Sequence, residues 1–214
     1  MGLEIERKYL QVNLQTLRQT LVDNGAHCLG AHFECNWVFD TSAGGLVTGG
    51  QLLRLRSQLW QDKTRHLLTL KLPVLQSGGF KMREERETEV ADGEAMRSIL
   101  EGLGYIVAAR YEKIREPWRI DTVVEVELDV LPFAEVVELE GRAQDIESVE
   151  RRLNLDNAEI STKSYHELHQ EWLRQNHKPE QLSFVFDEAQ REHWRTLLGL
   201  TDRAATNPAS TRQS

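Results

Sequence analysis

Charged and apolar residues alternate one by one along many segments of this chain. At its beginning, Glu4, Glu6 and Lys8 follow one another at two-residue spacing. A β-strand points alternate side chains to opposite faces, so these two carboxylates and one ammonium group would share a face. Further segments of this kind cover about residues 31–40, 51–59, 65–73, 81–90, 105–116, 118–130 and 134–141. The pattern predicts an α+β protein built on a large antiparallel sheet or barrel of about eight strands.

Other segments have the spacing and the end signals of helices. Each begins at a residue that can cap a helix or carries apolar residues three and four apart. The predicted helices run from Asn13 to Gly25, from Asp92 to Gly104, over about residues 143–153, from a capping box of Ser164 and Glu167, and from a second box of Asp187 and Gln190. Glycine pairs at 44–45, 49–50 and 78–79 are predicted to connect strands, because no GxxxxGK[ST] phosphate loop is present.

The composition excludes some classes of protein. The 214 residues carry a net charge of −8, whereas a protein whose main partner is nucleic acid is expected to be basic. Cys28 and Cys35 have neither the spacing of zinc ligands nor that of a disulfide framework, which suits a reducing cytosol. The sequence shows no signal peptide and no window of about 18 apolar residues. We therefore expect a cytoplasmic protein with no nucleic-acid partner and no membrane partner.

The alternating charge fits two architectures. In one, the charged faces of an antiparallel sheet contact bulk water. In the other, the sheet closes into a barrel, helices cover its outside, and the charged faces line a wet tunnel. The apolar stripes of the predicted helices favour the barrel, because they need a sheet face to cover, and closure would also leave no long unpaired edge. The residue pattern alone leaves both architectures open.

In a tunnel, the cations and the carboxylates would have separate roles. Uncompensated charges in a dry interior are costly, so such a tunnel must be hydrated or filled. Cations suit an elongated, highly anionic ligand, and carboxylates suit divalent metal ions lying between them and phosphate groups. The cations are Lys8, Arg54, Arg56, Lys71, Arg83, Lys113 and Arg115, and the carboxylates are Glu4, Glu6, Asp129, Glu138 and Glu140.

In these residues the chain resembles the CYTH superfamily, the triphosphate tunnel metalloenzymes, over about residues 2–173. The most specific match is the N-terminal ExExK motif, which is Glu4-Ile5-Glu6-Arg7-Lys8 here. Weaker motifs follow in the order of the family. They are Phe39-Asp40-Thr41, Leu53-Arg54-Leu55-Arg56, Leu70-Lys71, Arg83-x-Glu85-x-Glu87, Lys113-x-Arg115, Leu128-Asp129, Glu138-Leu139-Glu140 and Lys163-Ser164-Tyr165. Each motif is short, and their number and order carry the resemblance.

The resemblance implies an eight-stranded antiparallel tunnel, with helices packed outside, that holds a triphosphate. It implies that the cations named above, together with Lys163 at one tunnel mouth, grip the phosphate chain. It also implies that the carboxylates named above hold one or two Mg²⁺ or Mn²⁺ ions, helped by Glu85 and Glu87. The stretch after Asp129 is shorter than in the family, which leaves open whether Asp129 or Glu127 is the acid on the metal side.

We interpret the chain as a metal-dependent inorganic triphosphatase that produces diphosphate and phosphate. Resembling proteins also act on thiamine triphosphate or cyclise ATP, so a thiamine triphosphatase or a class IV adenylyl cyclase-like enzyme is an alternative. A further alternative is a non-catalytic sensor of polyphosphate or nucleotide, although the two acidic pairs, Glu4/Glu6 and Glu138/Glu140, favour an enzyme. We expect a tunnel domain over residues 1–175, a C-terminal helical appendage over 176–200, and a disordered tail over 201–214. The segment after residue 175 either packs on the domain or forms part of a homodimer contact.

Overall fold

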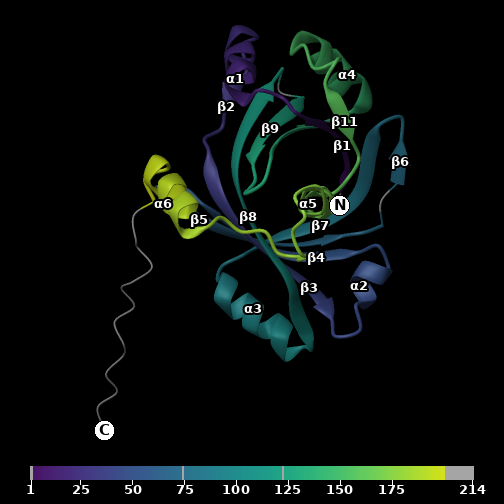
Figure 1. The fold of residues 1–214 in the computed structure, drawn as a ribbon, viewed down its shortest axis with the longest axis vertical. Coiled ribbons are helices and arrows are strands. Elements are labelled where there is room, and N and C mark those ends of the chain that lie inside the picture. Colours follow the sequence, from purple (N-terminus) through teal and green to yellow (C-terminus); the bar gives the residue numbers. More distant parts are fainter. Residues whose placement is uncertain (1, 74, 122, 201–214) are drawn as a thin grey trace.

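The strands form a closed barrel. The computed structural model describes residues 2–73, 75–121 and 123–200. Within them, eight strands are joined in the antiparallel order β1-β10-β9-β8-β3-β4-β5-β7, and β7 pairs with β1 to complete the ring (Figure 1). These strands are β1 (Gly2–Leu10), β3 (His32–Thr41), β4 (Leu52–Leu59), β5 (Thr64–Lys71), β7 (Phe80–Val90), β8 (Tyr105–Ile120), β9 (Val124–Val130) and β10 (Glu135–Glu140). The predicted α+β barrel is confirmed.

Shorter elements extend this ring. The strands β2 (His27–Cys28), β6 (Leu75–Ser77) and β11 (Glu159–Ser161) pair with β8, β7 and β1 respectively. The helices are α1 (Leu14–Asp23), α2 (Gly45–Thr48), α3 (Gly93–Gly102), α4 (Ala143–Arg152), α5 (Tyr165–Gln175) and α6 (Glu188–Leu197). None of the helices within the described ranges is both long and apolar enough to cross a bilayer. Cys28 and Cys35 are both free thiols.

The register places the charged strand faces inside the barrel. Across neighbouring strands Glu6 lies opposite Glu140, Lys8 opposite Glu138, and Glu138 opposite Glu127. The apolar residues between them face outward, where α1, α3, α4 and α6 lie around the ring, whereas α5 appears within the ring in this view (Figure 1). The largest core lies between α1, α4 and strands β8 to β10, and a second core lies beneath α3. Of the two architectures that the sequence left open, the barrel with an inner charged face is therefore the one adopted.

The predicted helix ends agree with the structure. Asn13 and Asp92 cap α1 and α3, each accepting a hydrogen bond from a first-turn N–H. The two predicted capping boxes open α5 and α6. The helix α2 was not predicted, because its two flanking glycine pairs indicated a simple connection. Asp40 supports it by accepting hydrogen bonds from the N–H groups of Leu46 (2.8 Å) and Val47 (3.1 Å).

One strand boundary was predicted incorrectly. We expected a break near Pro117, with a new strand from residue 118, but β8 continues through Pro117 to Ile120. Proline lacks the N–H that a ladder requires, yet its φ is compatible with a strand, and the Pro117 carbonyl accepts a hydrogen bond from Leu29 N–H at 2.8 Å. The chain reverses later, where Asp121 adopts a positive φ of 53°.

The segment after α5 packs on the barrel. Phe184 forms a parallel bridge with Tyr111 of β8, and both Phe184 and Phe186 are buried. The predicted helix from Asp187 is α6. The division of the chain into a domain over 1–175 and an appendage over 176–200 stays a prediction, and the expected tail over 201–214 lies outside the described residues.

Candidate active site

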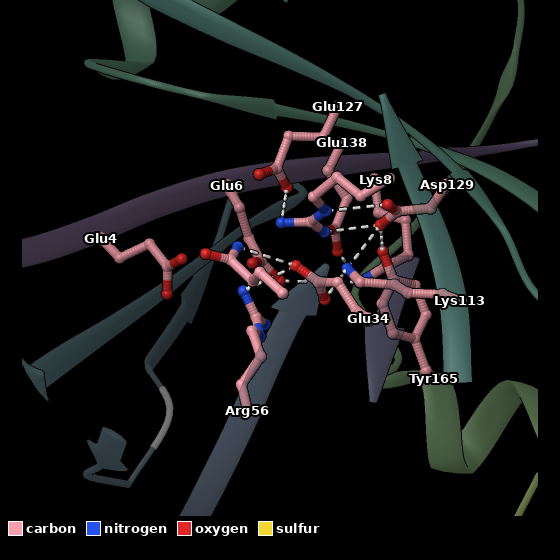
Figure 2. Close-up of polar contacts among 12 residues, drawn as sticks. Glu4, Glu6, Lys8, Glu34, Arg56, Lys113, Glu127, Asp129, Glu138 and Tyr165 are labelled. Atoms are coloured by element: carbon pink, nitrogen blue, oxygen red, sulfur yellow. Dashed lines mark hydrogen bonds and ion pairs between the residues drawn. The ribbon is translucent and has the colours of Figure 1, made fainter. Parts of the chain in front are cut away.

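The inner face of the barrel lines a cavity of about 230 Å³ that is dominated by charge (Figure 2). Eight cationic side chains contribute to it: Lys8, Arg54, Arg56, Lys71, Lys81, Arg83, Lys113 and Arg115. Seven carboxylates contribute as well: Glu4, Glu6, Glu85, Glu87, Glu127, Glu138 and Glu140. Alternation along each strand brings these groups inward, and closure of the sheet brings strands that are distant in sequence face to face.

Ion pairs organise the deepest part of the cavity. The Arg115 guanidinium donates to Asp129 Oδ1 at 2.8 Å and to Glu138 Oε2 at 2.8 Å, and it also contacts Glu127. Lys8 Nζ lies 2.9 Å from Glu138 Oε1. Burial opposes the charge of Arg115, but the carboxylates of Asp129 and Glu127 outweigh it and hold the Arg115 pKa well above its usual range. These cations therefore stay charged when no ligand is bound.

Asp129 and Glu127 occupy different environments although both point inward from β9. Asp129 is fully buried and accepts hydrogen bonds from Lys113 (2.9 Å), from Arg115 and from the Tyr165 hydroxyl. It does not line the cavity, whereas Glu127 does. Burial opposes ionisation of Asp129, but the adjacent Arg115 and Lys113 lower its pKa. The structure thus makes Asp129 an internal counter-ion and places Glu127 with the cavity carboxylates.

The cavity carboxylates form two clusters with overlapping membership. Oxygens of Glu4, Glu6 and Glu140 lie within 4.8 Å of one another, as do oxygens of Glu127, Glu138 and Glu140. Burial, reinforced by Glu127 and Glu4, raises the pKa of Glu140 well above its usual range. Burial raises the pKa of Glu127 to about 8 as well, with Asp129 adding to the effect. Ionising every member of these clusters is therefore unfavourable unless a cation joins them.

A third acidic group lies at the β1–β7 seam. Lys71 Nζ is 3.2 Å from Glu4 Oε2 and also contacts Glu85. Burial, together with a hydrogen bond to Glu4, raises the pKa of Glu85 to about 7. Glu87 accepts a hydrogen bond from Thr69 Oγ1 at 2.7 Å. The Arg83 guanidinium instead donates to two backbone carbonyls, at residues 72 (2.5 Å) and 50 (2.9 Å).

Lys163, like Asp129, is a predicted site residue that does not line the cavity, and its side chain points to the surface. Its Nζ pairs with Glu171 at 2.5 Å, two turns along α5, and the side chain is 48% exposed. Only its backbone carbonyl takes part in the site, where it accepts a hydrogen bond from Lys8 Nζ at 3.0 Å. The residues that follow it, Ser164, Tyr165 and His166, line the cavity at the start of α5. The expectation that Lys163 projects into a tunnel mouth is not met in this structure.

Several site residues were missed by the sequence analysis. Lys81 lines the cavity and pairs with Glu6 at 2.7 Å, and Tyr111 lines it beside Arg54. Glu34 is fully buried behind the lining and pairs with Arg56 at 3.2 Å (Figure 2). The two-residue period could have revealed two of them, because Lys81 lies two residues before Arg83 and Tyr111 two before Lys113. Glu34 carried no such signal, since its neighbours on β3 are not a charged run.

Comparison with known proteins identifies the family. Residues 2–166 match the CYTH domain. The chain belongs to the CYTH domain family. No protein of curated function matches the chain.

Solved structures share the CYTH fold at low sequence identity. The PH1819 protein of Pyrococcus horikoshii OT3 is 21% identical, with a TM-score of 0.68 over 78% of this chain and 98% of that protein. An adenylate cyclase candidate from Vibrio parahaemolyticus is 22% identical, with a TM-score of 0.65 over 78% and 98%. HpAC1 of Hippeastrum, an adenylyl cyclase candidate described as having a dominant triphosphatase activity, is 22% identical, with a TM-score of 0.60 over 84% and 98%.

CYTH proteins are metal-dependent, and the carboxylate clusters of this chain fit that chemistry. The donors are hard carboxylate oxygens, which suit Mg²⁺ or Mn²⁺ and disfavour soft metals. Burial is the main cause of the raised pKa values of Glu127 and Glu140, with neighbouring carboxylates adding to it, and a bound divalent ion would favour the ionised form of both groups. Glu4, Glu6, Glu127, Glu138 and Glu140 are therefore the residues that would hold a divalent ion.

Proposed function

We propose that this CYTH protein hydrolyses inorganic triphosphate to diphosphate and phosphate, with Mg²⁺ or Mn²⁺, and without a covalent intermediate. The observation that carries the proposal is the composition of the cavity. Eight cations converge on about 230 Å³, and two overlapping clusters of carboxylates lie among them in the same space. Water would break the terminal phosphoanhydride bond and release the terminal phosphate.

The charge balance supports a metal that binds together with the anion. When every group is ionised, eight cations and seven carboxylates make the cavity lining nearly neutral, and Asp129 and Glu34 add two buried carboxylates behind it. A triphosphate alone would bring several uncompensated negative charges into a partly buried space, which is strongly unfavourable. A bound divalent ion would supply the compensating charge and polarise phosphoryl oxygens. We therefore propose that anion and metal bind as a unit.

The cations differ in how much they are already neutralised. Arg115 and Lys8 are held by close carboxylates, whereas the nearest carboxylate to Arg54 is Glu87 at 3.9 Å, and Arg83 donates to backbone carbonyls. Arg54 and Arg83 can therefore bind phosphate oxygens without first breaking a strong ion pair. The more tightly paired cations fix the positions of the carboxylates around them. The chain thus has one set of cations that contact substrate and another that shapes the cavity.

The hollow next to the acidic side of the cavity offers no stacking partner to a substrate with a ring system, whereas Tyr111, Tyr165 and His166 line the cavity itself. The acidic side of the cavity opens into a second hollow that shares Glu4, Glu85, Glu87 and Glu140 with it. Among the described residues, no aromatic side chain lines this hollow. Trp118 is buried in the main core, and Trp37 packs in the core beneath α3. Stacking of a base or a thiazolium ring therefore has no partner at this mouth.

Phosphate release by the purified protein tests the proposal. Inorganic triphosphate, thiamine triphosphate and ATP are compared side by side, each with Mg²⁺, with Mn²⁺ and with a chelator. We expect metal-dependent release that is fastest from inorganic triphosphate and is lost in Glu4→Gln. Glu84→Gln is the matched control, because Glu84 precedes Glu85 on β7 and pairs with Arg86 on the exposed face, at 3.1 Å; this variant keeps its activity.

Other outcomes would redirect the assignment. Formation of cyclic AMP and diphosphate from ATP would favour the cyclase alternative, which the descriptions of the Vibrio and Hippeastrum neighbours make worth testing. Faster release from thiamine triphosphate would favour that substrate instead. Tight binding of triphosphate with no release under any metal condition would refute the enzyme and favour a sensor.

A further inference from the structure

The C-terminal strap, defined as residues 182–191, covers an edge of the barrel strand β8. On one side β8 pairs with β3 from Tyr105 to Arg115, but on the other side its pairing with β9 begins only at Ile114. The strap occupies part of this vacant edge, from Arg110 to Glu112. Phe184 N–H donates to the carbonyl of Arg110 at 3.0 Å, and Glu112 N–H donates to the carbonyl of Phe184 at 3.0 Å.

The strap also carries a ring that fixes Tyr111. Phe184 is 3% exposed and stacks on the Tyr111 ring, with the centroids 5.1 Å apart. His166 of α5 contacts both rings edge-on, at 5.4 Å from Tyr111 and 5.2 Å from Phe184. The Tyr111 ring is therefore held between the strap and the first turn of α5.

The hydroxyl of Tyr111 meets one of the least neutralised cations of the cavity. Tyr111 lines the cavity, and its oxygen accepts a hydrogen bond from Arg54 Nη1 at 3.2 Å. A guanidinium donates and never accepts, so the phenolic proton remains available to a different acceptor. The other side-chain contacts of Arg54 are long, to Thr69 Oγ1 at 3.4 Å and to Glu87 at 3.9 Å. Tyr111 and Arg54 together present donors to an anion in the cavity.

We propose that Tyr111 is an additional substrate-binding residue, which donates to a phosphate oxygen beside Arg54, and that Phe184 is the positioning residue that holds it there. The inference rests on the proposed function and deepens it. Residue 184 lies beyond the stretch 2–166 that matches the CYTH domain, so the strap is an addition to that domain which reaches its active site.

A double-mutant cycle tests the proposal through kcat/KM for inorganic triphosphate. Tyr111→Phe keeps the ring and removes the hydroxyl, and we expect it to lower kcat/KM about tenfold, the scale of one hydrogen bond to a charged group. Phe184→Ala, which frees the ring, should lower kcat/KM about fivefold to tenfold. In the Tyr111→Phe background the same Phe184→Ala change should cost less than about twofold, because the hydroxyl that it positions is already absent.

Phe186→Ala is the matched control. Phe186 lies on the same strap and is 2% exposed, but its ring packs against Phe33, with centroids 5.7 Å apart. We expect both Phe→Ala variants to lose comparable thermal stability, whereas Phe186→Ala keeps kcat/KM within about twofold at a temperature where circular dichroism shows every variant folded.

Three results would overturn the proposal while leaving the proposed function intact. One is an equal loss from Phe184→Ala in both backgrounds, and another is a loss in Phe186→Ala as large as in Phe184→Ala. The third is a kcat/KM in Tyr111→Phe equal to that of the wild type, which would overturn the role of Tyr111 itself. Absence of triphosphatase activity in the wild-type protein would instead refute the proposed function, and the inference with it.

Discussion

Asp129 and Glu127 provide a matched pair on one strand face, because Glu127 borders the cavity and Asp129 does not. Both project inward from β9, and both contact Arg115. Asp129 also accepts hydrogen bonds from Lys113 and Tyr165 and is fully buried. Asp129→Asn would keep the volume and remove the charge, and it would leave two buried cations without their shared counter-ion.

The expected cost follows from this geometry. Removing one partner of a buried ion pair costs about 3–5 kcal/mol when the remaining charge is left uncompensated. Arg115 would keep Glu127 and Glu138, and Lys113 would keep Glu34 at 3.6 Å, so we expect the lower end, about 3 kcal/mol. For a domain of this size, each kcal/mol shifts the unfolding midpoint by about 2–4 °C, so Asp129→Asn should lower it by roughly 6–12 °C. Glu127→Gln should cost less than about 1 kcal/mol, because Glu127 borders the cavity and burial already raises its pKa to about 8.

Thermal and urea unfolding, followed by far-ultraviolet circular dichroism at pH 7.5, measure both variants. The effects on activity should be reversed when both variants are assayed at a temperature where they are folded. Glu127→Gln should lose the stimulation of activity by Mg²⁺, and Asp129→Asn should retain it. The reasoning is refuted if Glu127→Gln destabilises the protein as much as Asp129→Asn, or if Asp129→Asn leaves the midpoint unchanged.

Three further predictions concern pH, packing and metal binding. Burial, with His169 adding to it, lowers the pKa of His166 to about 4. Because the pKa of this histidine in the unfolded state is near 6.5, the unfolded state binds more protons below that pH. Acidification from pH 7.5 to 5 should therefore lower the unfolding free energy by about 2 kcal/mol through this group. Urea titrations at both pH values should show a smaller loss in His166→Gln than in wild type. A Cβ on Gly93 would lie 2.6 Å from His66 Nδ1, so Gly93→Ala should destabilise the protein by about 1–3 kcal/mol despite the better helix propensity of alanine; a higher unfolding midpoint would contradict this. Mg²⁺ at about 100 times its Kd should add about 2.7 kcal/mol to the unfolding free energy, measured as a thermal shift, and Glu4→Gln should lose most of that gain; an equal shift in the variant would exclude Glu4 as a ligand.

Much of the architecture could be predicted from the sequence because local signals determine it. The caps at Asn13 and Asp92 set helix starts that the structure reproduces, since each cap needs only the backbone of the next turn. Alternation along β1 determined that Glu4, Glu6 and Lys8 share a face, because the strand period is two. The motifs, taken in order, also identified the family, which the CYTH match confirms.

Only the closed barrel decided which charges meet and which of them are neutralised. Glu127 and Asp129 are equivalent by periodicity, and they differ because Lys113 and Tyr165 converge on Asp129 from β8 and α5. Lys163 lies in a family motif, yet its side chain pairs with Glu171 of the following helix α5 and not with the cavity residues. The ring of Tyr111 stacks on Phe184 of the strap, which lies some seventy residues later in the chain. Strand periodicity is a local property that the sequence shows directly, whereas partners brought together by closure and by a distant segment depend on the whole fold.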